Sequence, residues 1–231
     1  MRRAAVAGVI LALAGCRRHA VPTAAGAVCP PAARIAALVG GRGRTVIADC
    51  VAYAPGFFWL GATLAYDSAT KQDPRLSLIY GGHPPRAYDI GAAPADVLTR
   101  LISGNQDLRV SVRKPSPASH VVRLGVYGQH GDHNHPEADE LVVILGLVAH
   151  APPQILWMGD GDRIRTAADG CIALRTVDLD IPFGDRLEMA TAERSRRADG
   201  TPAPCPPGRN MRQTIGYRPT PLPQGRVLRE P

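Results

Sequence analysis

The chain has 231 residues, enough for one ordinary domain or two very small ones. A hydrophobic content of 45% is typical of a globular protein and excludes a disordered stalk. The formal net charge is +7, but the arginines are spread along the chain, without the clustered stripe of a nucleic-acid-binding protein. We therefore expect no nucleic-acid partner, while attraction to anionic lipid or to an acidic protein stays open.

The N-terminal residues have the pattern of a bacterial export signal. Arg2 and Arg3 precede an apolar run over 4–14, which is much shorter than the ~20 residues of a membrane-spanning helix. The run ends in LAGC at 13–16, which resembles the lipobox of bacterial secreted lipoproteins. The resemblance implies that a signal peptide, 1–15, is cleaved before Cys16 and that Cys16 carries lipid.

The lipoprotein resemblance also implies where the protein works. A diacylglycerol thioether on Cys16 and an acyl chain such as palmitate on its amino group supply several chains, and two or more anchor a protein stably. Gram-negative lipoproteins that stay at the inner membrane usually have aspartate after the lipidated cysteine, whereas this chain has Arg17. We therefore expect a lipid anchor in the outer membrane, facing the periplasm, with 16–28 as a flexible tether.

Four cysteines remain once Cys16 carries lipid, and an exported protein is expected to pair them as disulfides. The sequence has no C-x-x-C pair, so we expect neither a thiol redox site nor a zinc knuckle. Four cysteines allow three pairings. We predict Cys29–Cys50 and Cys171–Cys205, because each bond then joins cysteines that are local in sequence.

Two short helices and many strands are predicted in chain order. Pro31 and Gly40 bracket an apolar segment and predict a helix over 32–39. A second helix is predicted over 94–103, where apolar residues recur on one face. Alternation and turn residues predict the following strands: 45–54, 57–66, 75–80, 107–113, 120–127, 140–149, 154–158, 177–181, 186–194 and 211–217.

This order of elements predicts a single α+β domain over 29–217, stapled by disulfides. We expect a mainly antiparallel β-sheet, or two packed sheets, with one or two short helices on a face. The Pro-rich segment 218–231 is expected to be an irregular tail.

The densest group of potential metal ligands lies in 130–137. Imidazole and carboxylate groups suit zinc, copper and nickel. The candidate ligands are His130, Asp132, His133, His135 and Glu137. The alternative, which we favour, is a solvated hairpin loop between strands ending at Tyr127 and starting at Glu140, with no cofactor.

Three further motifs are interpreted as structural. The sequence Asp160-Gly161-Asp162 lacks the additional ligands of a calcium loop and predicts a turn. Ser111 begins an S-x-x-K match, but it lies in an alternating strand and no K-T-G sequence follows. The aromatic cluster at 57–59 could anchor a partner, and we expect core packing instead.

The sequence thus predicts a non-enzymatic envelope lipoprotein that binds an envelope protein or another envelope component. Inhibitor, immunity and secretion-accessory roles all belong to this class. The alternatives are a periplasmic metal-binding protein that uses the 130–137 loop, and an envelope hydrolase whose active site has no recognisable motif.

Overall fold

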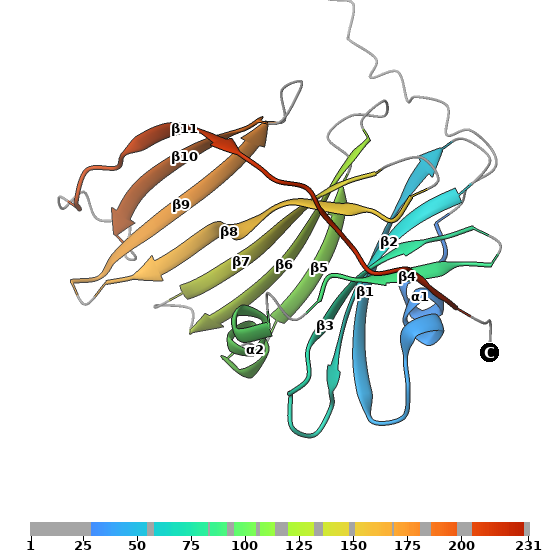
Figure 1. Cartoon of the computed structure of the whole chain (residues 1–231). Helices are drawn as coiled ribbons and strands as arrows, with labels where there is room; N and C mark the ends of the chain where they lie inside the picture. Colours follow the sequence, from blue (N-terminus) through green and yellow to red (C-terminus); the bar gives the residue numbers. More distant parts are fainter. Residues whose placement is uncertain are drawn as a thin grey trace, which may run out of the picture.

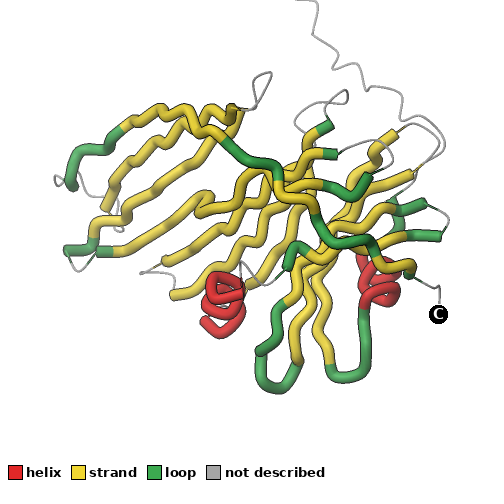
Figure 2. The backbone as a smooth tube through the Cα atoms, in the orientation of Figure 1, coloured by secondary structure: helices red, strands yellow, loops and turns green. Residues whose placement is uncertain are grey.

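The computed structural model describes residues 29–54, 58–82, 84–91, 95–104, 107–113, 120–131, 136–147, 151–167, 169–180, 186–197 and 205–228. The signal peptide at 1–15, Cys16 and the tether at 16–28 lie outside the described residues. Within the described ranges the chain forms two helices and thirteen strands, which Figures 1 and 2 show. The helices are α1 (Ala32–Val39) and α2 (Ala95–Gly104).

The strands form a small and a large antiparallel sheet. The small sheet has the order β1-β2-β3-β4-β13 and the large sheet the order β11-β10-β9-β8-β7-β6-β5. The small sheet consists of β1 (Arg44–Ala54), β2 (Phe58–Asp67), β3 (Arg75–Tyr80), β4 (Arg86–Asp89) and β13 (Arg226–Val227). The large sheet consists of β5 (Asp107–Arg113), β6 (Val121–Gly131), β7 (Pro136–Gly146), β8 (Gln154–Thr166), β9 (Cys171–Asp180), β10 (Arg186–Arg197) and β11 (Asn210–Gly216), and β12 (Thr220–Pro221) pairs with β8.

The predicted α+β class is wrong, because the protein is largely β, with two packed sheets. Both predicted helices are present, at 8 and 10 residues, but neither is long enough to form a layer of its own. Strands β6 and β8 are longer than their sequence patterns indicate, because pairing across a wide sheet extends them past their apolar segments. The physical layers are therefore sheet on sheet.

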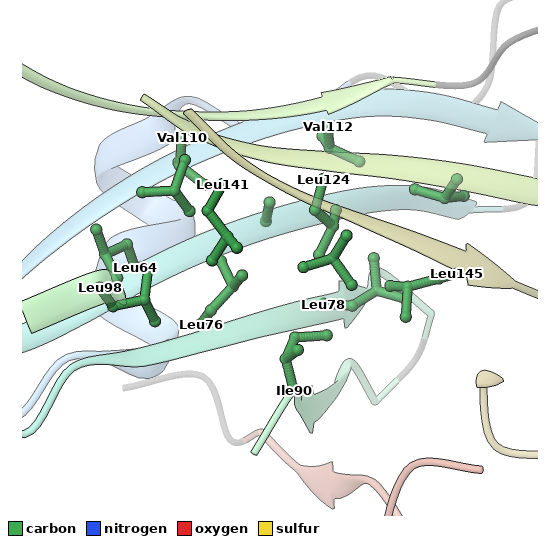
Figure 3. Packing of buried hydrophobic residues seen from close by; sticks show 14 of the residues in the cluster. Leu64, Leu76, Leu78, Ile90, Leu98, Val110, Val112, Leu124, Leu141 and Leu145 are labelled. Carbon is green, nitrogen blue, oxygen red and sulfur yellow. The ribbon is translucent and has the colours of Figure 1, made fainter. Parts of the chain in front are cut away.

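The main core lies between the two sheets. Alternate residues of each strand point inward, so that Leu64 and Leu78 of the small sheet meet Leu124 and Leu145 of the large one, as Figure 3 shows. All four side chains are fully buried. Burying such a side chain stabilises the fold by roughly 1.5–3 kcal/mol relative to leaving it in water.

The helices cover different parts of this sandwich. Helix α2 contributes Leu98, Leu101 and Ile102 to the main core. Helix α1 instead packs Ile35 into a second cluster on the outer side of the small sheet. Trp59 joins that second cluster, which confirms core packing for this member of the aromatic segment; Phe57 lies outside the described residues.

Both predicted disulfides are present with the predicted pairing. Cys29–Cys50 joins the segment before α1 to β1, and Cys171–Cys205 joins the start of β9 to the segment before β11. Each bond therefore fastens a peripheral segment to a strand.

The C-terminal segment, expected to be irregular from residue 218, ties the two sheets together. Strand β12 pairs with β8 of the large sheet and β13 pairs with β4 of the small sheet. Leu222 is buried in the main core and Leu228 in the second cluster. The pattern was missed because each strand has two residues, too few to show alternation.

Candidate functional site

The large sheet is wider than the layer that covers it. Among the described residues, the buried side chains that the large sheet gives to the main core come from β5, β6 and β7, with Ile155 and Met158 of β8 packed against them. Strands β9, β10 and β11 contribute none, and Figure 1 shows them extending to the left, away from the small sheet. We call these three strands the wing.

The strand register carries the core face of the sheet into the wing. Asp139 shares the core face of β7 with Leu141 and lies opposite Arg163 of β8. Arg163 lies opposite Arg175 of β9, which lies opposite Glu193 of β10. Because directly opposed residues share a face, one row of charged residues, from Asp139 to Glu193, crosses the core face from β7 to β10, beside apolar residues of the same face such as Val177.

Two adjoining hollows open at this row of charged residues, and both are lined by Arg163. One, of about 240 Å³, lies beside α2, and the other, of about 440 Å³, lies on the wing. Their shared lining residue makes them one surface, which we call the trough. Its lining includes Asp139, Arg163, Arg165, Ala173, Arg175, Glu193 and Arg209.

Asp139 organises the inner end of the trough. It accepts hydrogen bonds from Nη2 of Arg165 on both carboxylate oxygens, at 2.6 and 2.7 Å, and from Nε of Arg163 at 3.2 Å. Arg163 also pairs with Asp160, with 2.9 Å between Nη2 and Oδ2. These charge-assisted hydrogen bonds hold both guanidinium groups against Asp139. This end of the trough is therefore preorganised and close to neutral.

The arginines at the outer end of the trough differ from Arg163 and Arg165 in their side-chain contacts. Within the part of the chain that the structure describes, no side-chain hydrogen bond or ion pair holds Arg175 or Arg209. Arg175 is half-buried and lies directly opposite Arg163, a like-charge arrangement that destabilises a sheet. Glu193 lies opposite Arg175 on its other side without an ion pair to it in the described chain. An anionic group of another molecule, bound beside Arg175, would offset the repulsion between Arg175 and Arg163.

The predicted metal loop is only partly visible. His130 of β6 and Glu137 of β7 lie opposite each other, and Nε2 of His130 is 2.7 Å from Oε2 of Glu137. Asp132, His133 and His135 lie outside the described residues. The described residues contain no group of three potential metal ligands. The hairpin is also longer than predicted, because β6 continues past Tyr127 to Gly131 and β7 begins at Pro136.

The turn predicted at Asp160-Gly161-Asp162 is wrong, since β8 continues through it with an irregularity in register. On the face of β7 opposite to that of Asp139, the Glu140 carboxylate accepts from the Asp162 N–H at 3.1 Å and from Nη2 of Arg123 at 3.0 Å. Burial raises the pKa of the Glu140 carboxyl, against the lowering effect of the Asp162 N–H and then of Arg123. The segment is therefore held straight by long-range contacts that its own sequence does not reveal.

Ser111, the first residue of the S-x-x-K match, lies on that same outer face. A Cβ placed on Gly125 would be 2.7 Å from both the Ser111 Oγ and the Glu140 Oε1, so these two polar atoms face each other across the glycine. Lys114 lies outside the described residues. The serine thus lies in the middle of a strand, as its alternation predicted.

A separate cleft of about 520 Å³ opens between the β2–β3 loop and α2. Its wall is set by Asp67, which accepts hydrogen bonds from the N–H groups of Ala69 and Thr70, and by Arg44, which donates to Asp73. These bonds hold the pKa of both carboxyls below the usual range: the N–H of Thr70 does so for Asp67, and Arg44 does so for Asp73. The Asp73 carboxylate is therefore already satisfied within the chain.

The trough has only a weak signal in the sequence. Arg175 and Arg209 lie in different segments, and only the pairing of β10 with both β9 and β11, together with the Cys171–Cys205 bond, brings these segments to one surface. Compared with known proteins, the chain matches no family model, no curated protein sequence and no solved structure. Among the described residues, no helix is both long enough and apolar enough to cross a membrane.

Proposed function

We propose that this chain is a lipid-anchored, non-enzymatic binding domain of the bacterial envelope whose trough receives acidic side chains of an envelope protein. The observation that carries the proposal is the row of charged residues, from Asp139 to Glu193, that crosses the core face where the large sheet extends beyond its partner layer. A sheet face left uncovered in a monomer is normally polar, but this one is also hollowed and has two arginines without a partner in the described chain.

Arginine chemistry supports an acidic partner. The guanidinium group is always charged and its planar fork matches a carboxylate with two parallel hydrogen bonds. Arg175 and Arg209 are available for such bonds, while Arg163 and Arg165 are already fixed by Asp139. A rigid inner end and an available outer end suit recognition of an extended acidic segment.

The anchor is tested with Cys16→Ala in the full chain. If Cys16 carries lipid, wild-type protein labels with a palmitate analogue and sediments with membranes, whereas the variant does neither. Fractionation of the labelled cells checks both. A variant that still labels and still sediments would refute the lipid anchor without affecting the trough.

The partner surface is tested by photo-crosslinking in intact cells. Ala173 and Thr176 are both exposed, lie on the same strand and point to opposite faces, with Ala173 in the trough. A photoreactive residue at Ala173 is expected to capture a discrete envelope protein, and the same residue at Thr176 is expected to capture at least about tenfold less. Equal capture at both positions, or none at either, would contradict the proposal.

The role of the arginines is tested in the same crosslinking assay. Arg175→Gln together with Arg209→Gln is expected to lower capture at Ala173 about tenfold, because charge-assisted hydrogen bonds are worth roughly 1.5–3 kcal/mol. Arg194→Gln, an exposed arginine on the opposite face of β10, is the matched control and is expected to change capture little. Undiminished capture in the double variant would show that the trough does not recognise acidic groups.

A further inference from the structure

The two edges of the large sheet are protected to very different degrees. At one edge, Asp49 of β1 accepts a hydrogen bond from the N–H of Val112, at 2.9 Å, and so caps β5 with a carboxylate. At the other edge, β10 is the only strand of the described residues that pairs with β11. Its residues from Asn210 to Thr214 are exposed, and Met211, at 57% exposure, is the most exposed large apolar side chain of the described chain.

The hydrogen-bond pattern defines which backbone groups of β11 point outward. The N–H of Glu193 donates to the carbonyl oxygen of Arg209, so this opposed pair is a hydrogen-bonded one. Hydrogen-bonded and non-hydrogen-bonded pairs alternate along antiparallel strands. The odd-numbered residues, such as Gln213, therefore bond to β10, while Arg212 and Thr214 direct their N–H and C=O groups away from it.

We infer that this free edge pairs with the same edge of a second copy, antiparallel, about a two-fold axis at Gln213. In this register Arg212 of each copy faces Thr214 of the other, and these are the residues whose backbone groups point outward. Met211 then faces Ile215 across the new pair, so the exposed methionine gains an apolar neighbour. The two large sheets become one continuous sheet.

The edge of β11 is complementary to itself, which favours a second copy of this chain over an unrelated strand as its partner. A two-fold axis at Gln213 opposes no like charges, whereas an axis at Arg212 would place two arginines directly against each other. The same segment therefore supplies both sides of the pair, as a two-fold interface requires. This inference depends on β11 alone and does not rest on the proposed function of the trough.

The test uses cysteines in the full chain in its native membrane. At the two-fold axis Gln213 forms a non-hydrogen-bonded pair with itself, with Cα atoms about 4.5 Å apart, which is within the range a disulfide spans. Gln213→Cys is expected to give a dimer on a non-reducing gel under mild oxidation. Met211→Cys is the control, because the two Met211 positions would be displaced by four residues, roughly 13 Å, along the strands.

A second substitution separates pairing from accidental collision. Thr214→Pro removes an N–H that points away from β10, so the pairing with β10 keeps its hydrogen bonds while the new pair loses two, one from each copy. Added to Gln213→Cys, it is expected to reduce the crosslinked fraction at least about tenfold. Equal crosslinking of Gln213→Cys and Met211→Cys, crosslinking that survives Thr214→Pro, or a disulfide to a different protein would each overturn self-pairing.

Discussion

Replacing Cys171 and Cys205 together with alanine is expected to lower the free energy of unfolding by about 4 kcal/mol. The bond closes a loop of 34 residues, and cross-linking a loop of this length removes that much chain entropy from the unfolded state. Urea denaturation of the purified protein checks the value. Cys205 is followed by Gly208 and Arg209 of the trough. We therefore expect the wing to lose more of its local stability than the rest of the protein.

Hydrogen exchange separates a local from a global effect. Amides of β11 are expected to exchange faster in the variant, while those of β2 and β7 keep their protection, since these strands lie in the main core. Replacing Cys29 and Cys50 is the matched control: its loop of 21 residues predicts a loss of about 3 kcal/mol and faster exchange in α1. Uniform loss of protection after removal of Cys171–Cys205 would mean that the wing is not a separate unit of stability.

Gly161→Ala is expected to lower the free energy of unfolding by about 3 kcal/mol. A Cβ at this position would meet a Glu140 Oε at less than contact distance and Cγ2 of Val142 at 2.6 Å. The Glu140 side chain, only 12% exposed, would have to move away from Arg123, which separates a largely buried ion pair. Denaturation at pH 7 measures the change.

Gly216→Ala is the matched control for Gly161→Ala, since it also lies in a strand but has no atom within 4 Å of its Cβ position. Its effect is expected to stay below about 0.5 kcal/mol. In the double variant with Gly161→Ala and Glu140→Ala, the loss of unfolding free energy is expected to be smaller than the sum of the two single losses. The reason is that Glu140→Ala removes the carboxylate that the new Cβ would meet. Strict additivity would show that Gly161 and Glu140 do not share this space.

Local patterns were sufficient for many elements of the fold. The strands Arg75–Tyr80 and Asp107–Arg113 have the predicted bounds, and α1 begins and ends as its flanking proline and glycine indicated. These features depend on alternation, helix spacing and turn residues, which neighbouring residues determine. The disulfide pairing was equally accessible, because each bond joins cysteines that are local in sequence. The lipid on Cys16 stays a prediction from sequence.

Only the tertiary structure decided the class of the fold and the position of the site. Asp160-Gly161-Asp162 would form a turn on its own residues, but the Glu140 carboxylate and the N–H of Val177 bind it as strand. The charged trough exists because β9 and β10 continue a sheet beyond its covering layer, and no single segment reports how wide that layer is. Alternation reveals which side chains share a face, whereas long-range pairing determines whether that face meets a second sheet, a partner or water.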